Sequence, residues 1–189
     1  PYFHTTDDFH PCYLPDGGIV FASARCERGV LCDQPDDLVV NLLHRVDADG
    51  GNLRRLSEGA LSESTPSVMN DGRILYTRWE YVDKGVIAAQ ALWAMRPDGS
   101  GSCEIYGNDI EDPMVFIHSR AIPGQNNLFV STGTFHHPFA VGPILLVDIN
   151  KPLHTLEPIR SLTPDTRASS GLIREQTGAY GEKFAHLRN

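Results

Sequence analysis

Histidines are the residues of this chain with the clearest capacity for chemistry. His136 and His137 are adjacent in a Gly-Thr-Phe-His-His-Pro segment, and His10 and His118 each stand immediately before a predicted strand. Neutral imidazole is the commonest nitrogen ligand of metals in proteins, so these four could form a metal site or face a haem. The alternative is that His136 and His137 point in opposite directions, as successive extended residues do, and make ordinary loop hydrogen bonds.

A second group with binding chemistry is the segment that contains Trp79, Tyr81 and Lys84. Its two aromatic rings could stack on a ligand such as a sugar, or could simply cover the edge of a sheet. Together with His10 and His118, these residues are the predicted ligand or partner face.

Cysteines and catalytic motifs limit the chemistry further. Cys26 and Cys32 lie in one loop with five residues between them, so a disulfide is expected; the alternative is two unpaired thiols. The sequence has no C-x-x-C-H, G-x-S-x-G, H-E-x-x-H or phosphate-binding glycine loop. Its catalytic residues are therefore unknown, and the sequence does not decide whether the protein is an enzyme.

The elements that position these residues recur as a repeat. An Asp-Gly or Asn-Asn turn precedes an apolar strand at Ile19–Phe21, at Ile74–Tyr76 and at Leu128–Val130. Equivalent residues are about 49 to 55 positions apart. A period near 50 with four strands per unit is typical of a β-propeller blade, and propellers close with about four to eight blades. The sequence therefore predicts an all-β chain with three four-stranded antiparallel blades, which is part of a larger propeller.

The blades are expected at about residues 10–57, 65–106 and 117–163, and residues 164–189 as a linker or the start of another blade. We call the strands of a blade a to d, from the ring centre outward, and expect the a strands to begin near Pro11, Ser67 and Ser119. The a–b and c–d turns are short, whereas the b–c loops span about 17, 12 and 11 residues and emerge on one side. Because binding residues concentrate on loops, that side is the candidate site.

Composition limits the class of partner. The net charge of −8 argues against a nucleic-acid groove, which requires a basic face. No apolar run approaches the length of about 18 residues that a membrane span needs. The expected partners are instead the remaining propeller blades or partner subunits.

Two sets of motifs carry a family resemblance. The Asp16-Gly17 turn with Ile19–Ser23, and the segment Val46–Leu56, resemble the TolB-type propeller repeat, also called WD40-like or PD40. Further motifs are similar to the propeller domain of the hydrazine synthase alpha subunit family; they are Ala91–Gly101, Val130–Gly133, Gly142-Pro143-Ile144 and Leu162–Asp165. The resemblance covers roughly residues 8 to 165.

The resemblance implies a periplasmic or secreted protein, sometimes joined to c-type haem domains. The family's enzyme makes hydrazine from ammonia and a nitric-oxide-derived intermediate at haem. This chain lacks C-x-x-C-H, so no haem attaches covalently within it, and a haem or divalent metal would come through other segments or a partner. Two hypotheses follow: a binding or scaffold module that uses the long loops, or a segment of a haem- or metal-dependent redox enzyme. A weaker third is the propeller of a prolyl-oligopeptidase-like hydrolase.

Overall fold

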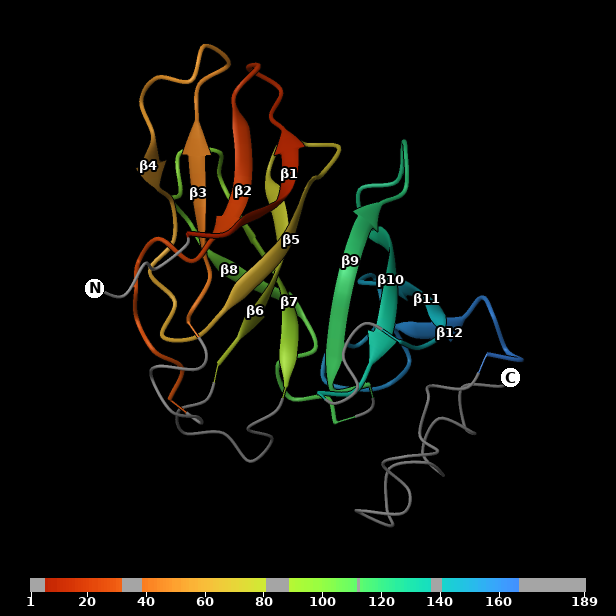
Figure 1. Cartoon of the computed structure of the whole chain (residues 1–189). Helices are drawn as coiled ribbons and strands as arrows, with labels where there is room; N and C mark the ends of the chain where they lie inside the picture. Colours follow the sequence, from red (N-terminus) through yellow and green to blue (C-terminus); the bar gives the residue numbers. More distant parts are fainter. Residues whose placement is uncertain (1–5, 32–38, 81–88, 112, 137–140, 167–189) are drawn as a thin grey trace.

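The computed structural model describes residues 6–31, 39–80, 89–111, 113–136 and 141–166. Every regular element within these ranges is a β-strand, which confirms the all-β prediction. The strands form three successive blades, and each blade is a meander of four antiparallel strands (Figure 1). No helix in these ranges has the length and apolar character needed to cross a membrane.

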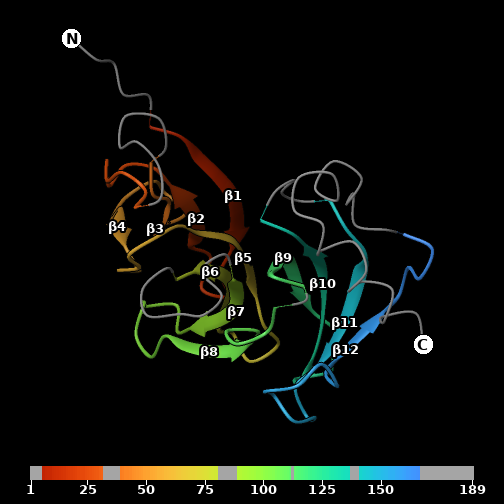
Figure 2. The same ribbon diagram turned by 90° about the horizontal axis from the view of Figure 1, so that it is seen from below.

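Each blade has its four strands in chain order. Blade 1 consists of β1 (Asp8–Tyr13), β2 (Ile19–Ser23), β3 (Leu42–Val46) and β4 (Arg54–Arg55). Blade 2 consists of β5 (Glu63–Val68), β6 (Ile74–Trp79), β7 (Gln90–Met95) and β8 (Cys103–Tyr106). Blade 3 consists of β9 (Val115–Ala121), β10 (Leu128–Thr134), β11 (Ile144–Asp148) and β12 (Ile159–Ser161). In Figure 2 the inner strands β1, β5 and β9 lie nearest to one another, and β4, β8 and β12 lie outermost.

The tight turns owe their shape to repeated Asp-Gly chemistry. In the β1–β2 turn, the carboxylate of Asp16 accepts a hydrogen bond from the backbone N–H of Gly18. Asp71 accepts the same bond from Arg73 in the β5–β6 turn. Gly17 and Gly72 both have φ +87°, which glycine adopts without steric cost. Local sequence therefore fixes these hairpins in the same way in two blades.

Apolar side chains between neighbouring blades form the core. Successive strand residues face opposite sides of a sheet, so Val20 and Ala22 of β2 lie on the same side. That side packs against blade 2. The core between blades 1 and 2 contains Leu14, Val20, Ala22, Leu43, Leu56, Ile74, Tyr76 and Met95. The core between blades 2 and 3 includes Met69, Leu75, Leu92, Tyr106, Phe116, Phe129, Leu145 and Val147. Each blade thus buries a face only against its neighbour, as the propeller architecture requires.

The inner strand of every blade contains a bulge at its centre. His10, Thr65 and His118 have φ of +54°, +49° and +53°, a left-handed conformation that is uncommon outside glycine. The pairing register shifts at the same points, between Phe9 and Cys12 and between Ser64 and Ser67 in the first two blades. The predicted starts of the inner strands, near Pro11, Ser67 and Ser119, are wrong, because β1, β5 and β9 begin three or four residues earlier. Because the bulge interrupts the two-residue alternation of side chains, the sequence pattern does not predict the first half of each inner strand.

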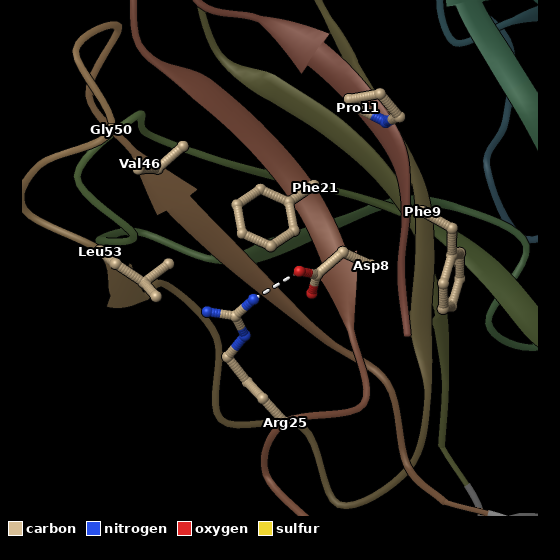
Figure 3. Close-up of a pocket in the computed structure, with 8 residues that line it drawn as sticks. All are labelled: Asp8, Phe9, Pro11, Phe21, Arg25, Val46, Gly50 and Leu53. Carbon is tan, nitrogen blue, oxygen red and sulfur yellow. Dashed lines mark hydrogen bonds and ion pairs between the residues drawn. The ribbon is translucent and has the colours of Figure 1, made fainter. Parts of the chain in front are cut away.

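The face of blade 1 that points away from blade 2 is uncovered. Tyr13 is 75% exposed and Leu53 is 50% exposed. A hollow of about 410 Å³ lies on this face, and an ion pair joins Asp8 and Arg25 (2.6 Å) within it. Figure 3 shows this pair beside the ring of Phe21. On blade 3, Ile144 is 46% exposed. Both terminal blades therefore show apolar residues where a propeller would place further blades.

Candidate functional site

The ends of the blades that carry the b–c loops form what we call the loop side. Here the rings of Trp79 and His136 lie with their centroids 4.7 Å apart. The side-chain amide nitrogen of Gln90 lies 3.2 Å from Nδ1 of His136. Because the amide donates to Nδ1, the proton of the neutral imidazole is on Nε2. The arrangement presents a half-buried imidazole with an N–H group beside an aromatic ring.

Strand ends bring these three side chains together. Trp79 is the last residue of β6, Gln90 is the first residue of β7, and His136 follows the end of β10. The backbone N–H of Gln90 donates to the carbonyl of Met114 (2.8 Å), and Gln90 pairs with Val115 in a parallel bridge. This backbone contact connects blades 2 and 3, so the cluster has a rigid base.

Trp79 also anchors the first b–c loop. Its side chain is 7% exposed and packs with Val30, Val40, Leu42 and Leu61 in a separate apolar cluster. The isolated bridge between Gly29 and Val39 closes the described part of that loop. Trp79 therefore covers the sheet edge, one of the two roles considered for it, and only a small part of its ring faces solvent.

His10 and His118 were expected just before the inner strands of blades 1 and 3, but the structure places them within those strands. They are inside strands β1 and β9, at the bulges, and not in the connections before those strands. Their rings meet edge to face with centroids 5.5 Å apart. Both residues are exposed by surface area, yet partial desolvation of their rings is the largest cause that lowers the pKa of both imidazoles; the charge of His118 lowers the pKa of His10 next, and the charge of Arg120 lowers the pKa of each further.

The structure separates the histidines into two places. His136 contacts Trp79 and Gln90, whereas His10 contacts His118. Within the residues that the structure describes, no three histidine, cysteine or acidic side chains come together in a way that could hold a metal ion.

Several predicted site residues lie outside the described residues. They are Tyr81, Lys84, His137 and Cys32. The sulfur of Cys26 lies 3.0 Å from the carbonyl oxygen of Val40, but its predicted partner Cys32 is not described, so the disulfide stays a prediction.

Two residues beside these clusters were missed by sequence reasoning. Gln90 ends the second b–c loop and faces His136, and Arg120 follows His118 at the next position but one in β9. Nothing in the local sequence marks Gln90, because its contact comes from a residue 46 positions away. Nothing in the local sequence marks Arg120 either, because its place beside His10 depends on the meeting of blades 1 and 3.

Comparison with solved structures shows which fold these blades belong to. Hydrazine synthase from Kuenenia stuttgartiensis has a TM-score of 0.63 and 18% identity over 77% of this chain and 22% of that chain. A TolB protein from Agrobacterium tumefaciens has a TM-score of 0.55 and 17% identity over 75% and 46% of the two chains. TolB from Acinetobacter baumannii has a TM-score of 0.51 and 11% identity over 84% and 33%.

These similarities confirm the predicted fold: three blades of a TolB-like β-propeller. The chain spans less than half the length of each of these structures. No protein-family profile matches the sequence, and no curated protein is similar enough to count as a relative.

Proposed function

We propose that this chain is a binding or scaffold module of an extracytoplasmic assembly, and that it contacts its partner through the loop side. The observation that carries the proposal is the meeting of Trp79 and Gln90 from blade 2 with His136 from blade 3. Binding residues concentrate on loops that a rigid scaffold holds, and the b–c loops of all three blades end on this side.

Two further points support this proposal. The cluster joins side chains of two blades beside a backbone bridge between Gln90 and Val115, and such a rigid arrangement suits a recognition surface. The similar TolB and hydrazine synthase structures are much longer than this chain, so further blades or partner subunits would lie against its uncovered faces. The extracytoplasmic location rests on the resemblance to the TolB-type repeat.

A second candidate is a segment of a haem- or metal-dependent redox enzyme. It is favoured by the similarity to the hydrazine synthase structure. In that case His136 would face a haem or divalent metal that other segments or a partner supply. One measurement distinguishes the two candidate functions, because only the redox enzyme requires cofactor binding that depends on His136.

The test compares matched variants on opposite sides of the blades. His136→Ala combined with Gln90→Ala alters the loop side, and Asp98→Asn alters the β7–β8 turn at the other end. Immobilised wild-type protein and both variants are exposed to a periplasmic extract, and captured proteins are identified by mass spectrometry. We expect a protein captured by the wild type and by Asp98→Asn to be lost with the loop-side double variant. Equal melting temperatures establish that both variants remain folded.

Other outcomes contradict the proposal. Retention of every captured protein by the loop-side variant would exclude this surface. Titration of the wild type with hemin or Zn²⁺, followed by absorbance, separates the second candidate. Binding that disappears with His136→Ala would favour the redox interpretation over a scaffold.

A further inference from the structure

The inner strands carry a second cluster, away from the loop-side residues, that the proposed function does not use. His10 of blade 1 and His118 of blade 3 are exposed, and their rings are 5.5 Å apart. Blade 2 separates these blades along the chain, so the two rings can meet only where the inner strands converge (Figure 2). The side chains therefore face the space at the centre of the blades.

Backbone conformation aims both imidazoles into this space. His10 and His118 adopt left-handed φ values at strand bulges, which turn a side chain out of the normal alternation. Thr65 occupies the equivalent position of blade 2, and its buried hydroxyl accepts a hydrogen bond from the backbone N–H of His118 (3.3 Å). Blade 2 thus holds the bulge of blade 3 in place. The bulge belongs to all three blades, but its conformation does not require histidine, so the two imidazoles need another explanation.

Arg120 is an exposed residue two positions after His118 on β9, where it adds a permanent positive charge near the two histidines. Its Nη1 donates to the carbonyl of Ser119 (2.8 Å), and the hydroxyl of Ser67 on blade 2 donates to the same carbonyl (2.8 Å). The Nη1 bond fixes one corner of the guanidinium, and among the described residues its other N–H groups have no further hydrogen bond and can face a ligand. No carboxylate forms an ion pair with Arg120 within the described ranges.

The charge of Arg120 acts on both imidazoles. After desolvation, which is the largest cause that lowers the pKa of both groups, the charge of His118 lowers the pKa of His10 and the charge of Arg120 lowers the pKa of both. No acidic residue contributes to either shift, although the whole chain has a net charge of −8. The centre of the blades is therefore locally basic within an acidic protein, and such a local field attracts anions.

We propose that His10, His118 and Arg120 form a binding site for a carboxylate group at the centre of the blades. The free edge of a guanidinium presents parallel N–H groups that match the two oxygens of a carboxylate. Each imidazole adds an N–H donor when neutral, and a positive charge when protonated. A divalent cation is a poorer match, because the adjacent guanidinium would repel it. The site is independent of the loop-side proposal and stands if that proposal fails.

The test uses acetate as the probe and histidine resonances as the readout. The full chain is titrated with sodium acetate at pH 6.0 and 8.0, with sodium chloride at equal ionic strength as the reference. We expect acetate to shift the ring resonances of His10 and His118, to raise the pKa of both, and to bind more tightly at pH 6.0. The resonances of His44 and His154 serve as internal controls, because His44 is buried in blade 1 and His154 pairs with Asp109.

Matched variants assign the binding to the site. Arg120→Gln removes the guanidinium, and loss of one charged hydrogen-bonding group is expected to weaken acetate binding by roughly tenfold or more. Arg160→Gln is the control, because Arg160 is an exposed arginine on β12 of the same blade. The control should bind acetate like the wild type.

Three results would overturn the proposal. One is a shift of His10 and His118 that chloride reproduces at equal ionic strength. Another is acetate binding that Arg120→Gln leaves unchanged in a variant with wild-type melting temperature. The last is a response of both histidines to inorganic phosphate or to Zn²⁺ but not to acetate, which would assign the site to a different ligand class.

Discussion

Glu63, the first residue of β5, is a carboxylate held in an unfavourable place. It is 0% exposed, and neither of its carboxylate oxygens has a hydrogen bond of good geometry within the described structure, although the Ser57 side chain and the Leu43 backbone lie close enough to act on it weakly. The nearest cation, Arg78, has its Nη1 atom 3.8 Å from Oε1 of Glu63. Nη2 of Arg78 instead pairs with Glu80 at 2.9 Å, and the guanidinium lies over the ring of Trp93, 4.4 Å from its centroid. Arg78 is thus shared among several partners and compensates Glu63 incompletely.

This environment makes stability depend on pH in a defined direction. Burial raises the pKa of Glu63 from 4.5 to about 7, although Ser57 and Arg78 act in the opposite direction. The folded state therefore keeps a proton that the unfolded state has already released. The stabilising effect of that proton is complete below pH 4.5 and is lost as the pH rises to about 7. The loss is on the order of 3 kcal/mol.

We predict that Glu63→Gln removes this loss. The free energy of unfolding, measured by urea titration from pH 4.5 to 8, should fall with pH more steeply in the wild type than in the variant. Glu58→Gln is the matched control, because Glu58 is exposed and pairs only with Arg55. Its pH profile should follow that of the wild type. A wild-type profile that rises through this range relative to Glu63→Gln would mean that Arg78 keeps Glu63 charged.

At the scale of the element, the tight turns differ in what surrounds them. Gly50 and Gly99 occupy the same place in the β3–β4 and β7–β8 turns, with φ of +85° and +91°. A Cβ atom on Gly50 would meet nothing within 4 Å, whereas one on Gly99 would lie 2.5 Å from the carbonyl oxygen of Leu56. The turn of blade 2 is therefore pressed against the backbone of blade 1.

This pair allows strain and packing to be measured separately. Gly50→Ala should cost roughly 1–2 kcal/mol, because only the left-handed conformation opposes a side chain. Gly99→Ala should cost about 1–3 kcal/mol more, since the clash is with backbone and forces the two blades apart. Denaturation of both variants by urea gives the comparison. An equal decrease in the free energy of unfolding for both variants would show that the contact between the blades adjusts to the extra methyl group without loss of stability.

The elements also show which parts of the fold the sequence could predict. The Asp16-Gly17 and Asp71-Gly72 turns follow from local chemistry, so their hairpins were predicted correctly. The first halves of the inner strands were not, because the bulges at His10, Thr65 and His118 disrupt the two-residue alternation. The clusters on the loop side and at the blade centre depend on contacts between blades, which no local pattern encodes. The sequence grouped His10 and His118 with His136, which the structure places in a different contact, and Arg120 and Gln90 could be found only from the fold.

At the scale of the whole molecule, the terminal blades leave unfinished surfaces. The β2 residues that face blade 2, Val20 and Ala22, are fully buried. On the opposite face of blade 1, Tyr13 and Leu53 are exposed. On blade 3 the corresponding residues are Ile144 and Leu162, which are 46% and 41% exposed. In a propeller each such face is covered by the next blade. Here that cover must come from outside the described residues, whether from further blades of the same protein or from another chain.

We predict that the 189-residue chain, prepared alone, associates with itself, because burying apolar sheet faces is the dominant favourable contribution to such contacts. Sedimentation velocity over a range of concentrations should show species larger than a monomer. Leu53→Lys and Ile144→Lys, one on each open face, should shift the distribution toward the monomer, since each places a charge where the contact would exclude water. Leu156→Lys is the control, because Leu156 is equally exposed but lies in the β11–β12 turn. If the wild-type chain sediments as a single monomer and melts cooperatively, the open faces are stable in water and three blades suffice. If only Leu156→Lys reduces association, the contact involves the turn and not the blade faces.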